Sequence, residues 1–339
     1  MIVSKFLTIK GILSFAGFHL VWLFFYMLFI TVLYEVFGLY WLSIPWLPVS
    51  LIGTAVAFYI GFKNNQSYDR LWEARKVWGA IVNSSRSWGV LINTYIQNDK
   101  LSDSELKKIK NQLVYNHIAW IYILRDQLLI PTQWEHVSLW KHFGKINVAR
   151  RENFGAGRFK DHSNEERQKK YFSEQKNWES ASNQATEIIH YQSQQLAILE
   201  NLQSINLFKQ IEMQKILLDF FDHQGKLERI KKFPLPRQYA NMSFTFTALF
   251  IFLLPCGMLG EFAKMGDCMI WITIPIAAIV GWIYIVMELI GDYSENPFEG
   301  LGTDIPMLSI CRTIEIDLLK MMGETDLPEP IQAINDILM

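Results

Sequence analysis

The sequence predicts an all-α membrane protein with four transmembrane helices and a set of long cytoplasmic helices. Three observations lead to this fold class. Half of the 339 residues are hydrophobic and 14% are aromatic, which is high for a soluble protein. Four stretches of about 19 to 24 residues contain no Asp, Glu, Lys or Arg, close to the ~20 residues with which a helix crosses a bilayer. The segment between the second and third stretches is polar and has helical periodicity.

Each charge-free stretch is a predicted transmembrane helix. The stretches are residues 11–34, 44–62, 238–260 and 268–287. The first stretch resembles a cleaved signal peptide only superficially, because its apolar run exceeds a signal core of ~7 to 15 residues and no small-residue cleavage site follows it. His19 is the one readily titratable side chain in the four stretches. Such a group is more often a neutral histidine bonded to a neighbouring helix than a proton sensor.

The basic residues give the orientation of the spans. The turn around Glu35 holds no Lys or Arg, and the turn from Glu261 to Asp267 holds only Lys264. Basic residues gather instead at the other ends of the spans, at Lys5, Lys10, Lys63, Arg70, Arg75, Lys76, Lys231, Lys232 and Arg237. Because Lys and Arg are retained on the inner side, we expect a multi-pass protein of the inner (plasma) membrane with both termini in the cytoplasm.

This topology divides the chain into four segments. Residues 1–62 hold the first two spans, 63–237 form a cytoplasmic helical region, 238–290 hold the last two spans, and 291–339 form a cytoplasmic C-terminal segment. Within the cytoplasmic region, helices are predicted over residues 66–96, 102–129 and about 175–221. The residues from 132 to 170 are rich in His, Arg, Lys, Gly and Asn and predict a solvated loop.

Several function classes are disfavoured. The net charge of -1 gives no basic excess for nucleic acid. Gly-rich phosphate loops, GxSxG, HExxH and paired catalytic carboxylates are missing from the sequence, so we expect neither an enzyme nor a cofactor. His136, His142 and His162 lack the short paired spacings of a zinc site and are expected to be surface residues. Cys256, Cys268 and Cys311 are isolated, which predicts neither disulfide nor metal site.

The most distinctive motif follows the second span. Residues 61–79 read GFKNNQSYDRLWEARKVWG. On physical grounds this is an interfacial helix with an Arg and Trp belt. As a pattern it resembles the signature of prokaryotic bestrophins, Gly-Phe-Arg-Asn-Asn-x-x-Tyr-x-Arg followed by Glu-Ala-Arg and Trp-Gly, with Lys in place of the first Arg. The matching residues are Lys63, Asn64, Asn65, Tyr68, Arg70, Glu73, Arg75 and Trp78.

Two further motifs extend the resemblance to the bestrophin family. Lys232-Phe233-Pro234 is a variant of the family's Arg-Phe-Pro triplet, and Asn296-Pro297-Phe298 follows the fourth span. The three motifs occur in the family's order and cover the chain to about residue 320. The resemblance implies a homopentamer around one central pore that conducts anions such as chloride passively. Because prokaryotic relatives include cation-preferring channels, a monovalent-cation channel of the same fold is the alternative.

The resemblance also implies which residues form the narrow neck of the pore. An apolar residue before a proline and two more at intervals of four correspond to Leu47 before Pro48, Leu51 and Ala55. An apolar ring gates by dewetting when it is narrow. Ala55 is smaller than the family's usual residue at this position. The pore is therefore expected either to be wider here or to be narrowed by Phe58 or Phe62 on the same side. The other interpretation of these residues is contact with lipid or with the core.

A stripe of small residues on the second span suits close packing against neighbouring helices. It consists of Ser50, Thr54, Ala57 and Gly61. A second constriction at the cytoplasmic end is implied near residue 206, and Ile205 is its candidate, with a register that can slip by one turn.

Two further observations bear on calcium regulation and on whether the protein is a transporter. The segment from Asn296 to Asp304 holds only two carboxylates, too few for a calcium site of the eukaryotic kind, since Ca²⁺ takes six to eight oxygens. A secondary transporter would show internal repeats and an intramembrane ionisable residue. Apart from His19 the sequence has neither, so a transporter is the less favoured alternative.

Overall fold

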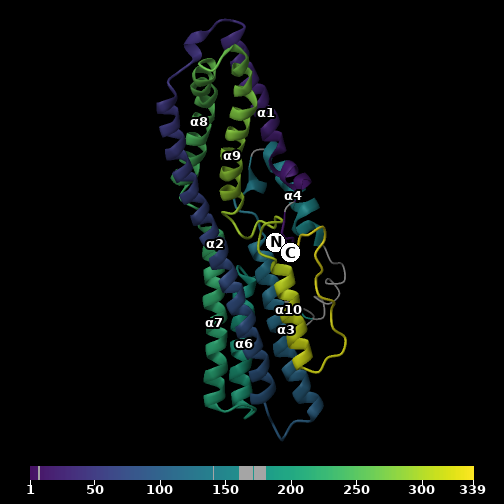
Figure 1. Ribbon diagram of the computed structural model, residues 1–339. Coiled ribbons are helices and arrows are strands. Elements are labelled where there is room, and N and C mark those ends of the chain that lie inside the picture. Colours follow the sequence, from purple (N-terminus) through teal and green to yellow (C-terminus); the bar gives the residue numbers. More distant parts are fainter. Residues whose placement is uncertain (7, 140, 160–170, 172–180) are drawn as a thin grey trace. The chain divides into compact units, whose positions relative to one another are not determined.

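The computed structural model describes residues 1–6, 8–139, 141–159, 171 and 181–339, and only the backbone of Lys10, residues 141–143 and Asp267 (Figure 1). Its helices are named as in Figure 1. They are α1 (Ile9–Glu35), η1 (Tyr40–Leu42), α2 (Trp46–Tyr95), α3 (Asp103–Leu128), η2 (His136–Ser138), α4 (Lys141–Phe154), η3 (Ala156–Phe159), α6 (Gln184–Asn201), α7 (Leu207–Lys232), α8 (Arg237–Ala263), η4 (Asp267–Ile272), α9 (Thr273–Tyr293) and α10 (Met307–Met321).

The chain folds into two compact units. The membrane unit comprises residues 4–70 and 234–295, and the bundle unit comprises residues 1–3, 71–233 and 296–339. Helix α2 is continuous over 50 residues and contributes its first half to the membrane unit and its second half to the bundle unit.

The membrane unit is built from α1, the first half of α2, α8 and α9. Helix α9 packs against both α1 and α8, as Figure 1 shows. Small residues allow close contacts in this unit: a Cβ atom on Gly53 would lie 2.6 Å from the Phe250 ring, and one on Gly257 would lie 2.9 Å from Val49. Many large apolar side chains point outward, among them Phe18 at 76% and Phe25 at 61% exposure. An apolar exterior is stable in hydrocarbon rather than in water.

The four predicted spans agree with the helices of the structure, with one difference. Four helical stretches of the described chain are long and apolar enough to cross a membrane, beginning at Gly11, Trp46, Leu207 and Cys268. The fourth differs from the expected uniform helix: its first turns are the 3₁₀ helix η4, and α9 begins only at Thr273 and continues to Tyr293.

The bundle unit packs α3, α6, α7, α10 and the second half of α2 around one large apolar core. Trp78, Trp88, Trp120 and Phe220 are among its fully buried side chains. Helix α3 begins at a capping box, in which Ser102 accepts from the Glu105 N–H and the Glu105 carboxylate accepts from the Ser102 N–H. Such a box satisfies two otherwise unpaired donors, and the prediction of a helix over residues 102–129 is confirmed.

The predicted helix over residues 175–221 was wrong, because two helices occupy this region. Helix α6 ends at Asn201 and α7 begins at Leu207. Gln203 between them takes a left-handed conformation with φ 58°, and Asn206 caps α7 by accepting from the Lys209 N–H. Asn is a strong N-cap residue, so α7 starts directly after Asn206, once α6 has ended at Asn201, without Gly or Pro between them. Residues 175–180 lie outside the described part of the chain.

The prediction of a solvated loop over residues 132–170 was also wrong for its described part. Helices η2, α4 and η3 occupy it, and Glu135 is fully buried. Arg151 of α4 donates to the Leu129 carbonyl at 2.8 Å, and the Ala156 N–H donates to the Gly300 carbonyl at 2.8 Å. These long-range contacts turn a polar segment into packed structure.

The first and last residues of the chain pair with one another within the bundle unit. The Val3 N–H donates to the Asp336 carbonyl at 2.9 Å, and the Leu338 N–H donates to the Met1 carbonyl at 2.8 Å. The pairing is antiparallel, between Ile2 and Ile337.

Candidate ion-conducting site

All five predicted neck residues lie on one outward face of α2. Leu47, Leu51, Phe58 and Phe62 are 69%, 63%, 68% and 69% exposed, and Ala55 is exposed as well. Spacings of three and four residues place them on the same side of the helix. The opposite side packs into the membrane unit through Val49, Gly53, Val56 and Ile60. The neck residues therefore make little contact within their own chain and offer an apolar surface to something outside it.

The stripe of small residues is exposed or half-buried within the chain, and its use for packing against neighbouring helices stays a prediction. Thr54 and Gly61 are exposed, and a Cβ atom on Gly61 would have no neighbour within 4 Å. The Ser50 hydroxyl donates to the Leu47 carbonyl and the Thr54 hydroxyl to the Ser50 carbonyl of the same helix. The closest intrachain approach uses Gly53 instead, because it lies between the buried residues Val49 and Val56.

A buried ion pair holds the end of the second span, just after Phe62, to the fourth span. Lys63 Nζ lies 2.5 Å from Glu288 Oε1, with the two side chains 2% and 8% exposed, and 3.6 Å from Asp292 Oδ1. The Ser243 hydroxyl of α8 donates to Glu288 Oε2 at 2.5 Å. Lys63 is therefore the cation for the buried Glu288 carboxylate, and such ion pairs in a membrane are stable only when both partners stay in place.

The next signature residue adds a hydrogen bond to the same junction. Asn64 Nδ2 donates to the Met287 carbonyl at 3.1 Å. A Cβ atom at Gly291 would lie 2.0 Å from Asn64 Oδ1, so the absence of a side chain there makes room for the amide. The adjacent Lys and Asn of the motif thus fix α2 against α9.

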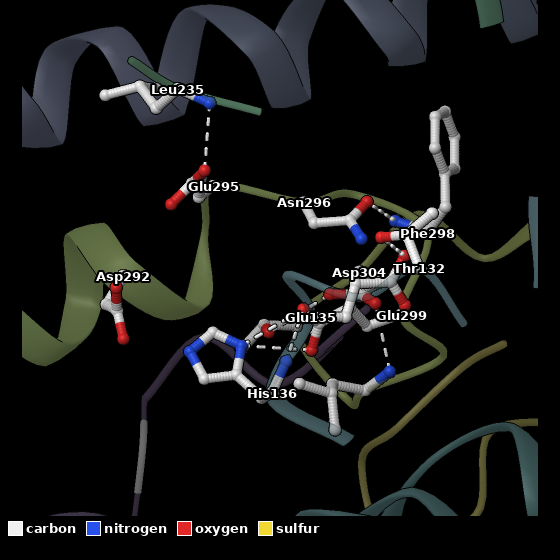
Figure 2. A network of polar contacts seen from close by, with 12 residues as sticks. Thr132, Glu135, His136, Leu235, Asp292, Glu295, Asn296, Phe298, Glu299 and Asp304 are labelled. Carbon is white, nitrogen blue, oxygen red and sulfur yellow. Dashed lines mark hydrogen bonds and ion pairs between the residues drawn. The ribbon is translucent and has the colours of Figure 1, made fainter. Parts of the chain in front are cut away.

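Glu295 joins two of the family motifs. The Arg70 Nε donates to the Glu295 carbonyl at 2.9 Å. The Glu295 carboxylate accepts a hydrogen bond from the Leu235 N–H at 2.9 Å, and Leu235 directly follows the Lys-Phe-Pro triplet. The same carboxylate lies 2.7 Å from Arg237 Nη2. Figure 2 shows the bond between Leu235 and Glu295. The first motif and the triplet, far apart in sequence, are therefore fixed by one residue.

The remaining signature residues serve different purposes. Asn65, Tyr68 and Arg75 are exposed, Glu73 pairs with Arg229 Nη2 at 2.6 Å, and Trp78 is fully buried in the bundle core. The structure thus brings together only the first part of the motif with the fourth span, and uses the later part for the packing of the bundle unit.

A second polar network surrounds the loop that begins with the Asn296-Pro297-Phe298 motif. Glu299 is 2% exposed and accepts from the His136 N–H at 3.2 Å, with His136 Nδ1 3.0 Å away. Glu135 is fully buried and pairs with Lys231 of α7. Figure 2 shows Glu135, His136 and Glu299 close to this loop. The Glu299 carboxylate of this loop is thus bound by donors of the chain itself. Among the described residues, no group of three or more His, Cys, Asp or Glu is arranged to hold a metal ion.

This network was missed by the sequence analysis. His136 was expected at the surface, but its side chain is only 14% exposed and contacts Glu299. The sequence held no signal for this network, because the partners Lys231 and Glu299 are far from Glu135 and His136 along the chain. The side chain of His142 and all of His162 lie outside the described residues.

Ile205 is not placed to line a conduit. It is 4% exposed and belongs to the bundle core, because the Ser204 and Ile205 N–H groups both bond to the Leu199 carbonyl and fold the turn inward. The expectation that Ile205 forms a constriction is therefore corrected. Phe208, one turn further along, is 81% exposed.

Asp304 makes the stability of the bundle unit depend on pH. Burial, with the nearby charge of Glu299, raises its pKa from the ordinary 3.8 to about 7. The folded chain then binds a proton that the unfolded chain releases, so stability falls as the pH rises from about 4 to about 7 and stays lower above.

We therefore expect Asp304→Asn to stabilise the protein at pH 8 by on the order of 4 kcal/mol and to change little at pH 4. Denaturant unfolding in detergent at several pH values measures this difference. Asp219→Asn, which removes an exposed carboxylate of α7, is the control and should shift stability equally at both pH values. An unchanged pH slope in Asp304→Asn would contradict the assignment.

The architecture and the site define a class: a helical membrane protein with an exposed apolar face on its second span and a buried ion pair that fixes the end of this span against the fourth. The chain matches the family model described as "Bacterial/Fungal Bestrophin protein" over residues 7–320. It therefore belongs to the bacterial and fungal bestrophin family, as the three sequence motifs predicted.

Similar proteins agree with this membership. The "Voltage-dependent anion channel-forming protein YneE" of Escherichia coli K12 is 26% identical over 284 residues, which cover 84% of this chain and 79% of that protein. The corresponding protein alr2987 of Nostoc is 25% identical and covers 82% of this chain and 79% of its own. The crystal structure of a bacterial bestrophin homolog from Klebsiella pneumoniae matches with a TM-score of 0.68 at 20% identity, covering 91% of this chain and 98% of that one.

Proposed function

We propose that this chain is the subunit of an ion channel that conducts anions such as chloride passively through an apolar neck. The observation that carries the proposal is the exposed apolar face of α2, from Leu47 to Phe62. An apolar ring of such residues provides a narrow pathway that wets and dewets. The names of the relatives from Escherichia coli and Nostoc, which describe anion channel-forming proteins, support the choice of anions.

The proposal includes assembly. One copy of α2 cannot enclose an aqueous path, so identical subunits must form a closed ring, and the family suggests a homopentamer. The ring lies in the inner membrane with both termini in the cytoplasm. Two observations support this orientation: the basic residues at the inner ends of the spans, and the pairing of residues 1–3 with residues 336–338, which requires both ends on one side. For the second constriction, at the cytoplasmic end of the pore, the exposed Phe208 replaces the buried Ile205 as the candidate residue.

Leu51→Ala tests the neck. We expect the variant to keep its oligomer and to raise the ion flux severalfold, because it widens and wets the constriction while removing little packing. The matched control is Ile60→Ala on the buried side of the same helix, where Ile60 is 0% exposed. It should cost about 2 to 5 kcal/mol and leave the unitary conductance of intact channels unchanged.

Single-channel recording in planar bilayers and mass measurement in detergent provide both readouts. A Leu51→Ala protein that dissociates while its surviving channels conduct normally would place Leu51 in a packing interface and reject the neck. The absence of unitary current steps from the wild-type protein would favour a secondary transporter instead. A reversal potential under a salt gradient distinguishes anions from the alternative of monovalent cations, which the exposed carboxylate of Asp69 favours.

A further inference from the structure

The outward face of α2 continues beyond the neck. Asn65 and Asp69 follow Phe62 at steps of three and four residues and are both exposed. The spacing places them on the side of the helix that carries Phe58 and Phe62. At 1.5 Å per residue, Asp69 lies about 10 Å beyond Phe62 along the helix axis. The first charged side chain on this face is therefore a carboxylate.

The two cations of the same helix segment are turned away from this face. Between Trp46 and Arg70 the charged residues of α2 are Lys63, Asp69 and Arg70. Lys63 is buried and paired with Glu288. Arg70 is partly buried and donates to the Glu295 carbonyl. Both positive charges are thus taken up by α9 and the residues that follow it, and neither is presented beside Asp69.

Asp69 itself is not neutralised within the chain. The structure gives its carboxylate no hydrogen bond or ion pair among the described residues. Asp69 is one of the residues that give the chain its negative formal charges. Repeated once per subunit in a ring, it produces several negative charges at one level, which concentrate cations and repel anions.

We propose that Asp69 determines selectivity at the inner mouth of the neck and lowers the permeability of anions relative to monovalent cations. The inference rests on the proposed function, because it requires that the face of α2 from Leu47 to Phe62 lines the pathway. It goes beyond that function by assigning the choice between ions to a residue outside the apolar neck. The apolar neck carries no fixed charge that could distinguish anions from cations. Asp69 carries such a charge.

Asp69→Asn is the direct test. Reversal potentials of single channels under a tenfold KCl gradient give the permeability ratio of Cl⁻ to K⁺. We expect Asp69→Asn to raise this ratio by about threefold or more at low salt, with a smaller change at high salt where charges are screened. Asn65→Asp places a second carboxylate one turn nearer to Phe62 on the same face and should lower the ratio. Asp69→Glu should keep the wild-type ratio.

Glu261→Gln is the matched control for the loss of a carboxylate. Glu261 lies at the end of α8 with its side chain 49% exposed and paired with Lys264, and its removal should leave the ratio unchanged. Wild-type unitary currents together with an unchanged ratio in both Asp69→Asn and Asn65→Asp would overturn the inference while the proposed channel stands. No current from the wild-type protein would reject the proposed function itself. If Asp69→Asn does not assemble, the shift in Asn65→Asp decides.

Discussion

Lys63→Met will destabilise the membrane unit by about 3 to 5 kcal/mol, which is among the largest effects expected of any single substitution here. In this variant the Glu288 carboxylate stays buried and keeps its hydrogen bond from the Ser243 hydroxyl. It loses its cation. An unpaired buried charge costs more than the lost attraction, because its hydration is not replaced. Unfolding of the protein in mixed detergent, followed by circular dichroism, measures the loss.

The double variant Lys63→Met with Glu288→Leu separates charge from shape. Because it removes both partners, we expect it to recover most of the stability lost in Lys63→Met. Lys264→Met is the control, since Lys264 is 70% exposed in its pair with Glu261 and an exposed pair contributes about 0 to 1 kcal/mol. A double variant no more stable than Lys63→Met would mean that the lysine stem, and not its charge, holds the helices together.

Lys231→Met should have an effect of similar size in the bundle unit, about 3 to 5 kcal/mol. Lys231 is 5% exposed and its partner Glu135 is fully buried. Burial lowers the pKa of Lys231, and the charge of Glu135 opposes that effect. Without the lysine, Glu135 keeps the Thr132 hydroxyl as a donor but loses its counter-charge.

The same unfolding measurement tests this pair. Lys231→Met with Glu135→Gln should regain stability, because a neutral amide needs no cation. Lys226→Met is the matched control on the same helix: Lys226 is 43% exposed in an i,i+4 pair with Asp222 and should matter by less than about 1 kcal/mol. If Lys226→Met and Lys231→Met proved equally harmful, the loss would reflect helix α7 as a whole and not the buried pair.

Local properties of the sequence were sufficient to predict the spans. Hydrophobicity over about 20 residues and the distribution of Lys and Arg are local signals, so the four spans were found within a few residues. The outward position of Leu47 and Leu51 agrees with the interpretation from the family, although its use as a pore neck stays a prediction.

The pairings between distant residues could not be predicted. Lys63 and Glu288 are 225 residues apart, and a single sequence contains no signal that joins them. The packed face of α2 was missed because Val49, Val56 and Ile60 resemble the other apolar residues of the span. The sequence analysis considered the small residues for helix packing instead, and two of these, Thr54 and Gly61, are exposed. The stop between α6 and α7 was missed because Asn206 caps a helix only when the preceding backbone turns away.

The continuity of α2 also constrains how the length of this chain can change. The helix buries Val56 and Ile60 in the membrane unit and Trp78 and Trp88 in the bundle unit, and no loop interrupts it between Trp46 and Tyr95. One residue inserted between Val56 and Ile60 would turn Ile60 by about 100° away from the packed side of the membrane unit. A substitution in this stretch changes a single contact, whereas a change in length moves every later residue of the membrane unit's part of the helix to another side, unless it comes in steps of about seven residues, or two whole turns.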